Sequence, residues 1–223
     1  MSHLFVNWAT CQVATRIQYL LFIMVLGLTH ALPLQAQKTE EQIRQEISKA
    51  AQAIKTMQCQ FLQTKHLKML NHNIVSKGKM YYQQPGSLRW EYTSPYTYTF
   101  ILNQDKVLLK NQQRHDVIDV NQSKFFKEIA RTMMGSVVGS CLADHKSFKS
   151  TLSETHDGQW AATLIPLRKD MQQMFQKMVV HFSPRQAVAT QVELIEKNGD
   201  KTVIELKNVQ TNEPISADVF TVR

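Results

Sequence analysis

The feature that most constrains the fold is an alternation of apolar and polar residues, which starts near Phe61 and recurs in short segments to the end of the chain. In residues 88–92 the apolar side chains share one parity and the charged side chains the other, and in residues 96–102 the aromatic side chains again share a parity. This period of two is typical of half-buried antiparallel strands. We predict strands at 59–67, 74–84, 87–94, 96–103, 106–111, 114–120, 146–156, 159–166, 177–183, 187–196, 201–209 and 218–222.

So many strands do not form a flat sheet. Turn residues separate them, notably at 84–86, 157–158 and 198–200, and the last two stretches are strong hairpin signals. Open twisted sheets of about ten strands or more tend to curl or close. The sequence therefore predicts one layer of about ten to twelve antiparallel strands, with a concave apolar face that other elements must cover.

Two helical patterns could provide this cover. From residue 38 to about 59, apolar residues recur at spacings of three and four, and Thr39 is a suitable N-cap. From 123 to 138 the apolar stripe is broad, and two glycines near its end predict that the helix bends or stops there. A short helical turn is expected at 168–173.

The N-terminus differs from everything that follows it. Residues 20–28 form an uncharged apolar run of nine residues, and Arg16 is the only Lys, Arg, Asp or Glu before residue 38. The run is too short to cross the roughly 30 Å hydrocarbon core of a bilayer as a helix. Pro33 and then Ala36 give a break and a small residue at a plausible cleavage point. We predict a secretory signal peptide over residues 1–36; an uncleaved anchor or a buried core helix are the alternatives.

Residues 37–223 are then expected to form a single domain, because no linker, low-complexity tract or repeat divides them. The whole chain carries a net charge of +8, and removal of Arg16 leaves +7. No run of four Lys or Arg residues forms a basic stripe, so we expect no nucleic-acid partner. The surplus supports only a mild preference for anionic membrane surfaces or acidic partners. No Cys stands at the predicted cleavage point, so we expect no lipid anchor there. We expect a soluble periplasmic protein, and a monomer.

Cys59 and Cys141 remain after the predicted cleavage. In an oxidising compartment two cysteines can form a disulfide. They can equally be buried as small apolar residues. The sequence leaves both alternatives open, because it cannot place the two Cα atoms within bonding distance.

Motifs of catalysis and metal binding are absent from the sequence. It contains no GxSxG, P-loop or GxGxxG motif. The histidines of the predicted mature chain lie outside any recognisable metal-ligand spacing; they are at positions 66, 72, 115, 145, 156 and 181. We therefore expect neither an enzyme nor a cofactor, with a secreted enzyme of unrecognised site as the remaining alternative.

Several segments, in this order and spacing, resemble a known family. They are residues 61–65 (FLQTK), 76–82 (SKGKMYY), 85–92 (PGSLRWEY), 164–167 (LIPL), 200–202 (DKT) and 215–220 (ISADVF). The chain resembles the periplasmic outer-membrane lipoprotein carriers of the LolA type over essentially the whole predicted mature region. In that family a basic residue directly before the proline of the second turn helps to latch the lid, whereas this chain has Gln84 there. We do not transfer the role to Arg89, whose parity differs from that of Trp90.

The resemblance implies a mainly β fold with helices, in which an N-terminal helix and a central helical lid cover a curled antiparallel sheet, an incomplete β-barrel. It implies that the protein holds the acyl chains of lipoproteins in an apolar cavity. It would receive them from an inner-membrane ABC transporter and pass them to an outer-membrane acceptor. The alternative is a module of the same fold that binds or senses a lipid or glycolipid.

The inward parity of the strands gives the candidate cavity residues, which are Met80, Tyr82, Leu88, Trp90, Tyr92, Tyr98, Phe100 and Leu102. The candidate lid residues are Phe125, Phe126, Ile129, Met133 and Met134. Any β-sandwich would also bury such residues in its core. An excess of methionine in and near the two possible cover segments favours the lid, because methionine repacks easily; these residues are Met133, Met134, Met171, Met174 and Met178.

Overall fold

The computed structural model describes residues 38–70, 72–119, 131–132 and 134–222. The predicted signal peptide lies outside this part of the chain. So do four of the five predicted lid residues, namely Phe125, Phe126, Ile129 and Met133.

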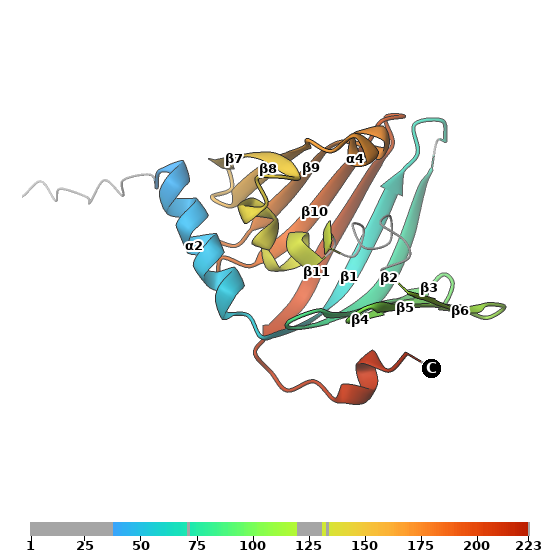
Figure 1. Cartoon of the computed structure of the whole chain (residues 1–223). Helices are drawn as coiled ribbons and strands as arrows, with labels where there is room; N and C mark the ends of the chain where they lie inside the picture. Colours follow the sequence, from blue (N-terminus) through green and yellow to red (C-terminus); the bar gives the residue numbers. More distant parts are fainter. Residues whose placement is uncertain (1–37, 71, 120–130, 133, 223) are drawn as a thin grey trace, which may run out of the picture. The chain divides into compact units, whose positions relative to one another are not determined.

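One antiparallel sheet of eleven strands dominates the fold (Figure 1). Its spatial order is β6-β5-β4-β3-β2-β1-β11-β10-β9-β8-β7, and within the described residues its two outer strands, β6 and β7, do not pair with each other. This confirms the predicted incomplete barrel with helices. The strands are β1 (Thr56–His66), β2 (Asn73–Gln83), β3 (Ser87–Ser94), β4 (Tyr98–Asn103), β5 (Lys106–Asn111), β6 (His115–Asp119), β7 (Phe148–Glu154), β8 (Trp160–Pro166), β9 (Phe175–Phe182), β10 (Ala189–Glu196) and β11 (Lys201–Thr211).

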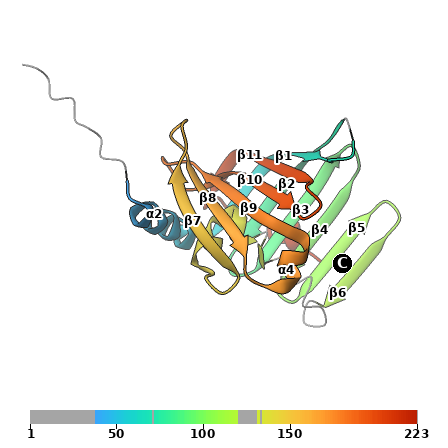
Figure 2. The ribbon, with the colours of Figure 1, turned by 90° about the horizontal axis from the view of Figure 1, so that it is seen from above.

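The predicted parity places the core on the concave face of this sheet. Leu88 and Trp90 on β3 are buried, and so are Phe100 and Leu102 opposite them on β4. In Figure 1 the strands from β7 across the sheet to β2 are seen face-on, whereas β3, β4, β5 and β6 are seen nearly edge-on. The sheet therefore curls. Viewed from above in Figure 2, β7 lies at one margin and the β5–β6 hairpin at the other. Both halves contribute to one hydrophobic cluster.

Gly78 on β2 is required because the Glu91 backbone and the Phe61 ring come very close to it. A Cβ at this position would lie 2.0 Å from the Glu91 carbonyl oxygen and 2.4 Å from the Phe61 ring. The Phe61 ring stacks on Trp90 with ring centroids 4.3 Å apart. The absence of a side chain at residue 78 therefore makes room for an aromatic stack that spans β1 and β3.

Helix α2 (Glu40–Ala53) begins as predicted at Thr39, which forms a capping box with Gln42. The predicted helix to about residue 59 is too long, because Ile54 is already extended and β1 starts at Thr56. Helical periodicity cannot show this end, since Ile54 stays buried and continues the apolar spacing as the C-cap.

The predicted strand at 218–222 is wrong. These residues lie in and after the 3-10 helix η3 (Ala217–Phe220). β11 already pairs with both β1 and β10, so a strand after it finds no free neighbour there. The segment instead contacts β3 and β4, where Arg89 and Asn103 donate hydrogen bonds to its Val219 and Phe220 carbonyls. Arg89 thus lies on the outer face of the sheet, opposite to the cavity.

The second predicted helix is helical at 131–132 and 134–138 and stops at Gly139, whose φ of 85° is left-handed, as the glycine prediction requires. The 3-10 helix η2 (Ser140–Ala143) follows, and the predicted helical turn is α4 (Lys169–Met174). Arg44 on α2 donates hydrogen bonds to the Leu142 carbonyl and to Ser150 on β7, which fixes α2 to these elements.

Cys59 and Cys141 are both buried and both free, so the second of the two alternatives is the one found. Burial raises the pKa of each thiol to about 12. Among the helices formed by described residues, none has the length and apolar character needed to cross a membrane.

Candidate functional site

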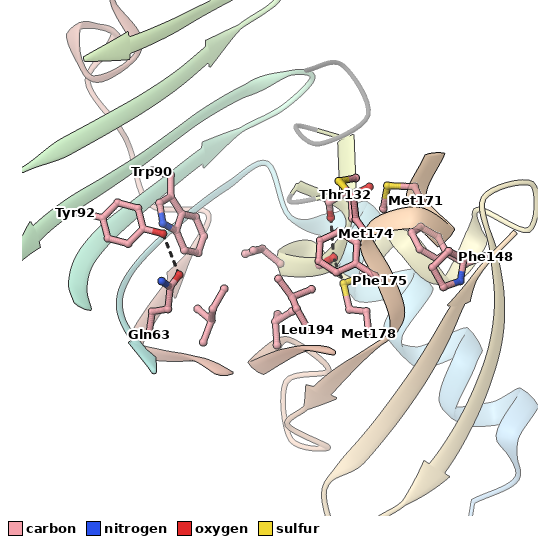
Figure 3. A pocket seen from close by; sticks show the side chains of 15 residues that line it. Gln63, Trp90, Tyr92, Thr132, Phe148, Met171, Met174, Phe175, Met178 and Leu194 are labelled. Carbon is pink, nitrogen blue, oxygen red and sulfur yellow. Dashed lines mark hydrogen bonds between the residues drawn. The ribbon is translucent and has the colours of Figure 1, made fainter. Parts of the chain in front are cut away.

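A cavity of about 250 Å³ lies between the concave face of the sheet and its helical cover (Figure 3). Its wall is formed by β1, β3, β7 to β11, α4 and the helical residues Thr132, Ser136 and Val137. The lining is almost entirely apolar: Gln63, Trp90, Tyr92, Thr132, Ser136, Val137, Phe148, Pro166, Met171, Met174, Phe175, Met178, Val192, Leu194 and Ile204. Such a space suits an apolar ligand with few polar groups.

Two of the eight predicted cavity residues, Trp90 and Tyr92, line this space. Tyr98 is partly buried against the same hydrophobic cluster. The other five are buried within the cluster and do not line the cavity: Met80, Tyr82, Leu88, Phe100 and Leu102. The structure therefore brings all eight predicted cavity residues to the concave face of the sheet, but only two of them border the cavity.

Met134 is the one predicted lid residue that the structure describes, and it is partly buried against the core cluster. Residues 134–138 of its helix cover the concave face (Figure 1). Ser136 in this helix is buried, and its hydroxyl lies 2.7 Å from the Thr132 carbonyl and 3.3 Å from the Met178 sulfur on β9. Val137 and Val138 of the same helix are buried in the hydrophobic cluster, so the described part of this helix packs on the core largely through apolar side chains.

A small polar group interrupts the apolar wall. Tyr92 donates a hydrogen bond to Gln63 Oε1 at 2.9 Å, and the two side chains face the cavity in Figure 3. Burial raises the pKa of Tyr92, while the nearby Trp90 N–H acts in the opposite direction. Among the described residues no acceptor meets the geometry of a hydrogen bond with that N–H, so the Trp90 indole nitrogen is buried without a partner. A buried donor without a partner is unusual in a folded protein and lowers the stability of the closed form.

Sequence reasoning missed most of the lining on β7 to β11 because it drew the candidate residues from β2 to β4. One sequence signal did indicate this region, namely the excess of methionine. Met171, Met174 and Met178 all line the cavity. Leu194 and Ile204 carry no such signal. Only the curl of the sheet brings their strands opposite Trp90.

A second hollow is lined mainly by polar side chains from the turn between β7 and β8 and from β9, β10 and β11, and an ion-paired group lies on the same three strands. Glu193 accepts from His181 at 3.1 Å and pairs with Lys201 at 2.7 Å, which links three neighbouring strands. Burial alone would raise the pKa of Glu193, but the hydrogen bond and charge of Lys201 and then of His181 hold it below its ordinary value. In the described segments no group of three or more His, Cys, Asp or Glu side chains is arranged to hold a metal ion.

Comparison with known proteins gives one family. The family model described as outer membrane lipoprotein carrier protein LolA matches residues 52–223. Two curated proteins named outer-membrane lipoprotein carrier protein are similar, one from Cupriavidus taiwanensis at 28% identity over 146 residues and one from Cupriavidus necator at 26% over 150 residues. Each alignment covers 66% of this chain and 65% of the relative, so it spans slightly less than two thirds of the relatives' length.

Among solved structures, an uncharacterized conserved protein from Thermus thermophilus has a similar fold. The TM-score is 0.50 at 8% identity, and the superposition covers 82% of this chain and 93% of that chain. At this identity the likeness concerns the fold alone.

Proposed function

This chain belongs to the LolA family of outer membrane lipoprotein carrier proteins, and on that premise we propose that it holds the acyl chains of lipoproteins in its cavity. The observation that carries the proposal is the cavity itself, which is enclosed by apolar side chains from both halves of a curled sheet and from the helices above it. Burial of an acyl chain there removes apolar surface from water at about 25 cal/mol per Å².

Loading requires the cover to move. The volume of about 250 Å³ is smaller than the roughly 300–1,000 Å³ of pockets that enclose drug-sized ligands, so a lipoprotein's acyl chains do not fit into it as it stands. We propose that the helical residues 134–138 swing away from the sheet on loading. Their neighbours at the cavity are flexible methionines on α4 and β9, which can repack against either the helix or the cargo.

The proposal includes transport from the inner to the outer membrane. The mature protein would start near Gln37 and act in the periplasm as a monomer. There it would accept cargo from an ABC transporter and deliver it to an outer-membrane acceptor. Intact-mass measurement of the exported protein tests the first point, and a full-length membrane-bound species would contradict it.

The carrier function is tested by mass spectrometry of the protein purified from its native compartment without detergent. We expect acylated lipoprotein or its lipid moiety in the spectrum, and release of radiolabelled lipoprotein from inner-membrane vesicles when the purified protein is added. Recovery of only a glycolipid, with no release of lipoprotein, would instead favour a lipid-binding module of the same fold.

A further inference from the structure

The end of the β1–β2 hairpin exposes an unusual amount of apolar surface. Met69 is 95% exposed, Leu70 45%, Ile74 38% and Val75 47%. These four account for half of the eight large apolar side chains that are exposed in the described parts of the chain. We call them the hairpin tip. Single exposed apolar residues are ordinary on a protein surface, but a cluster of four in seven positions indicates contact with something apolar.

The hairpin tip projects beyond its neighbours on one side. The terminal pair between β2 and β3 is Lys77 with Ser94, so the first four residues of β2, 73–76, have no partner on β3. At about 3.3 Å per residue this overhang measures roughly 13 Å. On the other side the base is fixed, because His66 pairs with Lys201 and the Lys68 amide donates to Asp200 at 2.9 Å. The tip is therefore an anchored projection.

The projection lies at the same edge of the sheet as the cavity. Figure 1 shows that the hairpin end and α4 both lie at the upper edge of the sheet, and the view from above in Figure 2 shows them on different sides of it. Gln63, which lines the cavity, is three residues from the end of β1 at this edge, and Leu194 is two residues from the end of β10. A surface touched by the tip would thus lie at the edge of the sheet that is near these two lining residues.

A positive charge lies directly beside the tip, because the exposed Lys68 precedes Met69 in the chain. Two carboxylates lie at the base of the hairpin: Glu196 pairs with Lys65 at 3.0 Å, and Asp200, which is only 9% exposed, accepts from the Lys68 backbone amide. Exposed apolar side chains next to a lysine fit the interface of an anionic bilayer, where the apolar groups enter the boundary and the ammonium meets the lipid phosphates.

We propose that the hairpin tip inserts into the interface of a lipid bilayer that contains anionic phospholipids, and that it thereby places the cavity entrance at the membrane surface. Ile74 and Val75 are consecutive strand residues and point to opposite faces. A protein partner would cover one of these faces, whereas a fluid bilayer surrounds the tip and covers both. This proposal rests on the carrier function proposed above, because a carrier of acyl chains must meet membranes.

The test is flotation of the purified protein with vesicles of phosphatidylethanolamine and phosphatidylglycerol, compared with vesicles of phosphatidylcholine alone. We expect binding to the anionic vesicles that weakens with salt. The double variant Met69→Asp/Leu70→Asp should lose at least about tenfold in binding, since one fully buried methionine alone accounts for such a factor. Lys68→Gln should reduce binding to anionic vesicles only.

The control is Val117→Asp, which introduces one carboxylate, as each of the two tip substitutions does, at a side chain that is 53% exposed. It lies on β6, four strands from β2 and so roughly 19 Å away. Equal loss in this control, or no vesicle binding by the wild-type protein, overturns the proposal. Unchanged vesicle binding by the double variant also overturns the proposal. If that variant binds protein-free vesicles normally but loses binding to membranes that contain proteins, the tip is a protein-docking surface.

Failure of the proposed carrier function looks different. Uptake of a diacylated lipopeptide from detergent solution does not need the tip, so the double variant should load normally in that assay. A wild-type protein that binds vesicles but takes up no lipopeptide would refute the carrier and leave the membrane contact standing.

Discussion

Replacement of Leu194 by glutamate tests whether the cavity holds acyl chains. Leu194 lies on β10, lines the cavity and is half-buried, so the fold should tolerate a change there. Full burial of a leucine contributes about 1.5–3 kcal/mol, of which a half-buried residue supplies roughly half. A polar group forced against an apolar ligand costs about 1–3 kcal/mol more. Together Leu194→Glu should weaken cargo binding by about 2–4 kcal/mol, or roughly 30- to 1,000-fold.

The effect should depend on pH with a defined sign. Burial under a bound acyl chain raises the pKa of the introduced carboxyl, because the charged form is the one that loses hydration. The loss of affinity should therefore be largest at pH 8 and should shrink as the pH falls and the carboxyl takes up a proton. We would measure it by displacement of an environment-sensitive apolar dye with a diacylated lipopeptide at pH 8 and pH 5.

Ile195→Glu is the matched control. Ile195 is the next residue of β10, is also half-buried and points to the outer face, where Lys177 and Lys201 lie beside it in register. It should bind cargo within about threefold of wild type, since surface changes stay within roughly ±0.5 kcal/mol. An equal loss in both variants, or a loss at residue 194 that is the same at both pH values, would refute acyl-chain binding at this wall.

Two further predictions concern stability and burial. Gly78→Ala should lower the free energy of unfolding by several kcal/mol, because its Cβ would lie 2.0 Å from a backbone oxygen. Gly86→Ala should change this free energy little, because no atom lies within 4 Å of the added Cβ. Thermal melting of the two variants compares the effects. Cys59 and Cys141, with pKa values raised to about 12, stay protonated at pH 8 and should resist iodoacetamide until denaturant is added; peptide mass spectrometry that finds either thiol alkylated in the native protein would contradict their burial.

The sequence allowed the sheet to be predicted more fully than the cavity, and the reason is physical. Parity assigns each strand residue to a face, so Leu88, Trp90 and Phe100 were correctly placed inward. Parity does not show which of the inward side chains are packed on all sides and which border the cavity. Leu88 lies at one end of β3 and is packed completely, while Tyr92, four residues on, borders open space.

The errors at the two ends of the chain have a related cause. Ile54 continues the helical spacing of α2 although the backbone there is already extended. The apolar residues at 218–222 suggested a strand, but strand formation needs an unpaired neighbour, and β11 has none to offer. Both outcomes depend on contacts between distant segments, which local periodicity does not contain.

The energy balance of a carrier leads to a last prediction, about the cover. An acyl chain of about fifteen carbons gains on the order of 12 kcal/mol on burial, at about 0.8 kcal/mol per CH₂, and such a gain alone would prevent release. The cover offsets it if four to six of its large apolar side chains, at about 1.5–3 kcal/mol each, regain contacts with the sheet when the cargo leaves. A variant whose cover packs less well against the sheet in the empty protein should therefore bind cargo more tightly.

Val138→Ala makes this change without altering the cavity wall. Val138 is 4% exposed, lies in the covering helix and does not line the cavity. Loss of two methyl groups should remove about 1.6 kcal/mol from the closed form, so cargo affinity should rise about 15-fold and release should slow. Val180→Ala on β9, where the side chain is fully buried in the sheet, removes the same groups from both forms and should lower stability alone. If Val138→Ala binds cargo more weakly, or if both variants alter release equally, the contacts of this helix do not oppose loading, and the offset to the acyl-chain energy must come from another element.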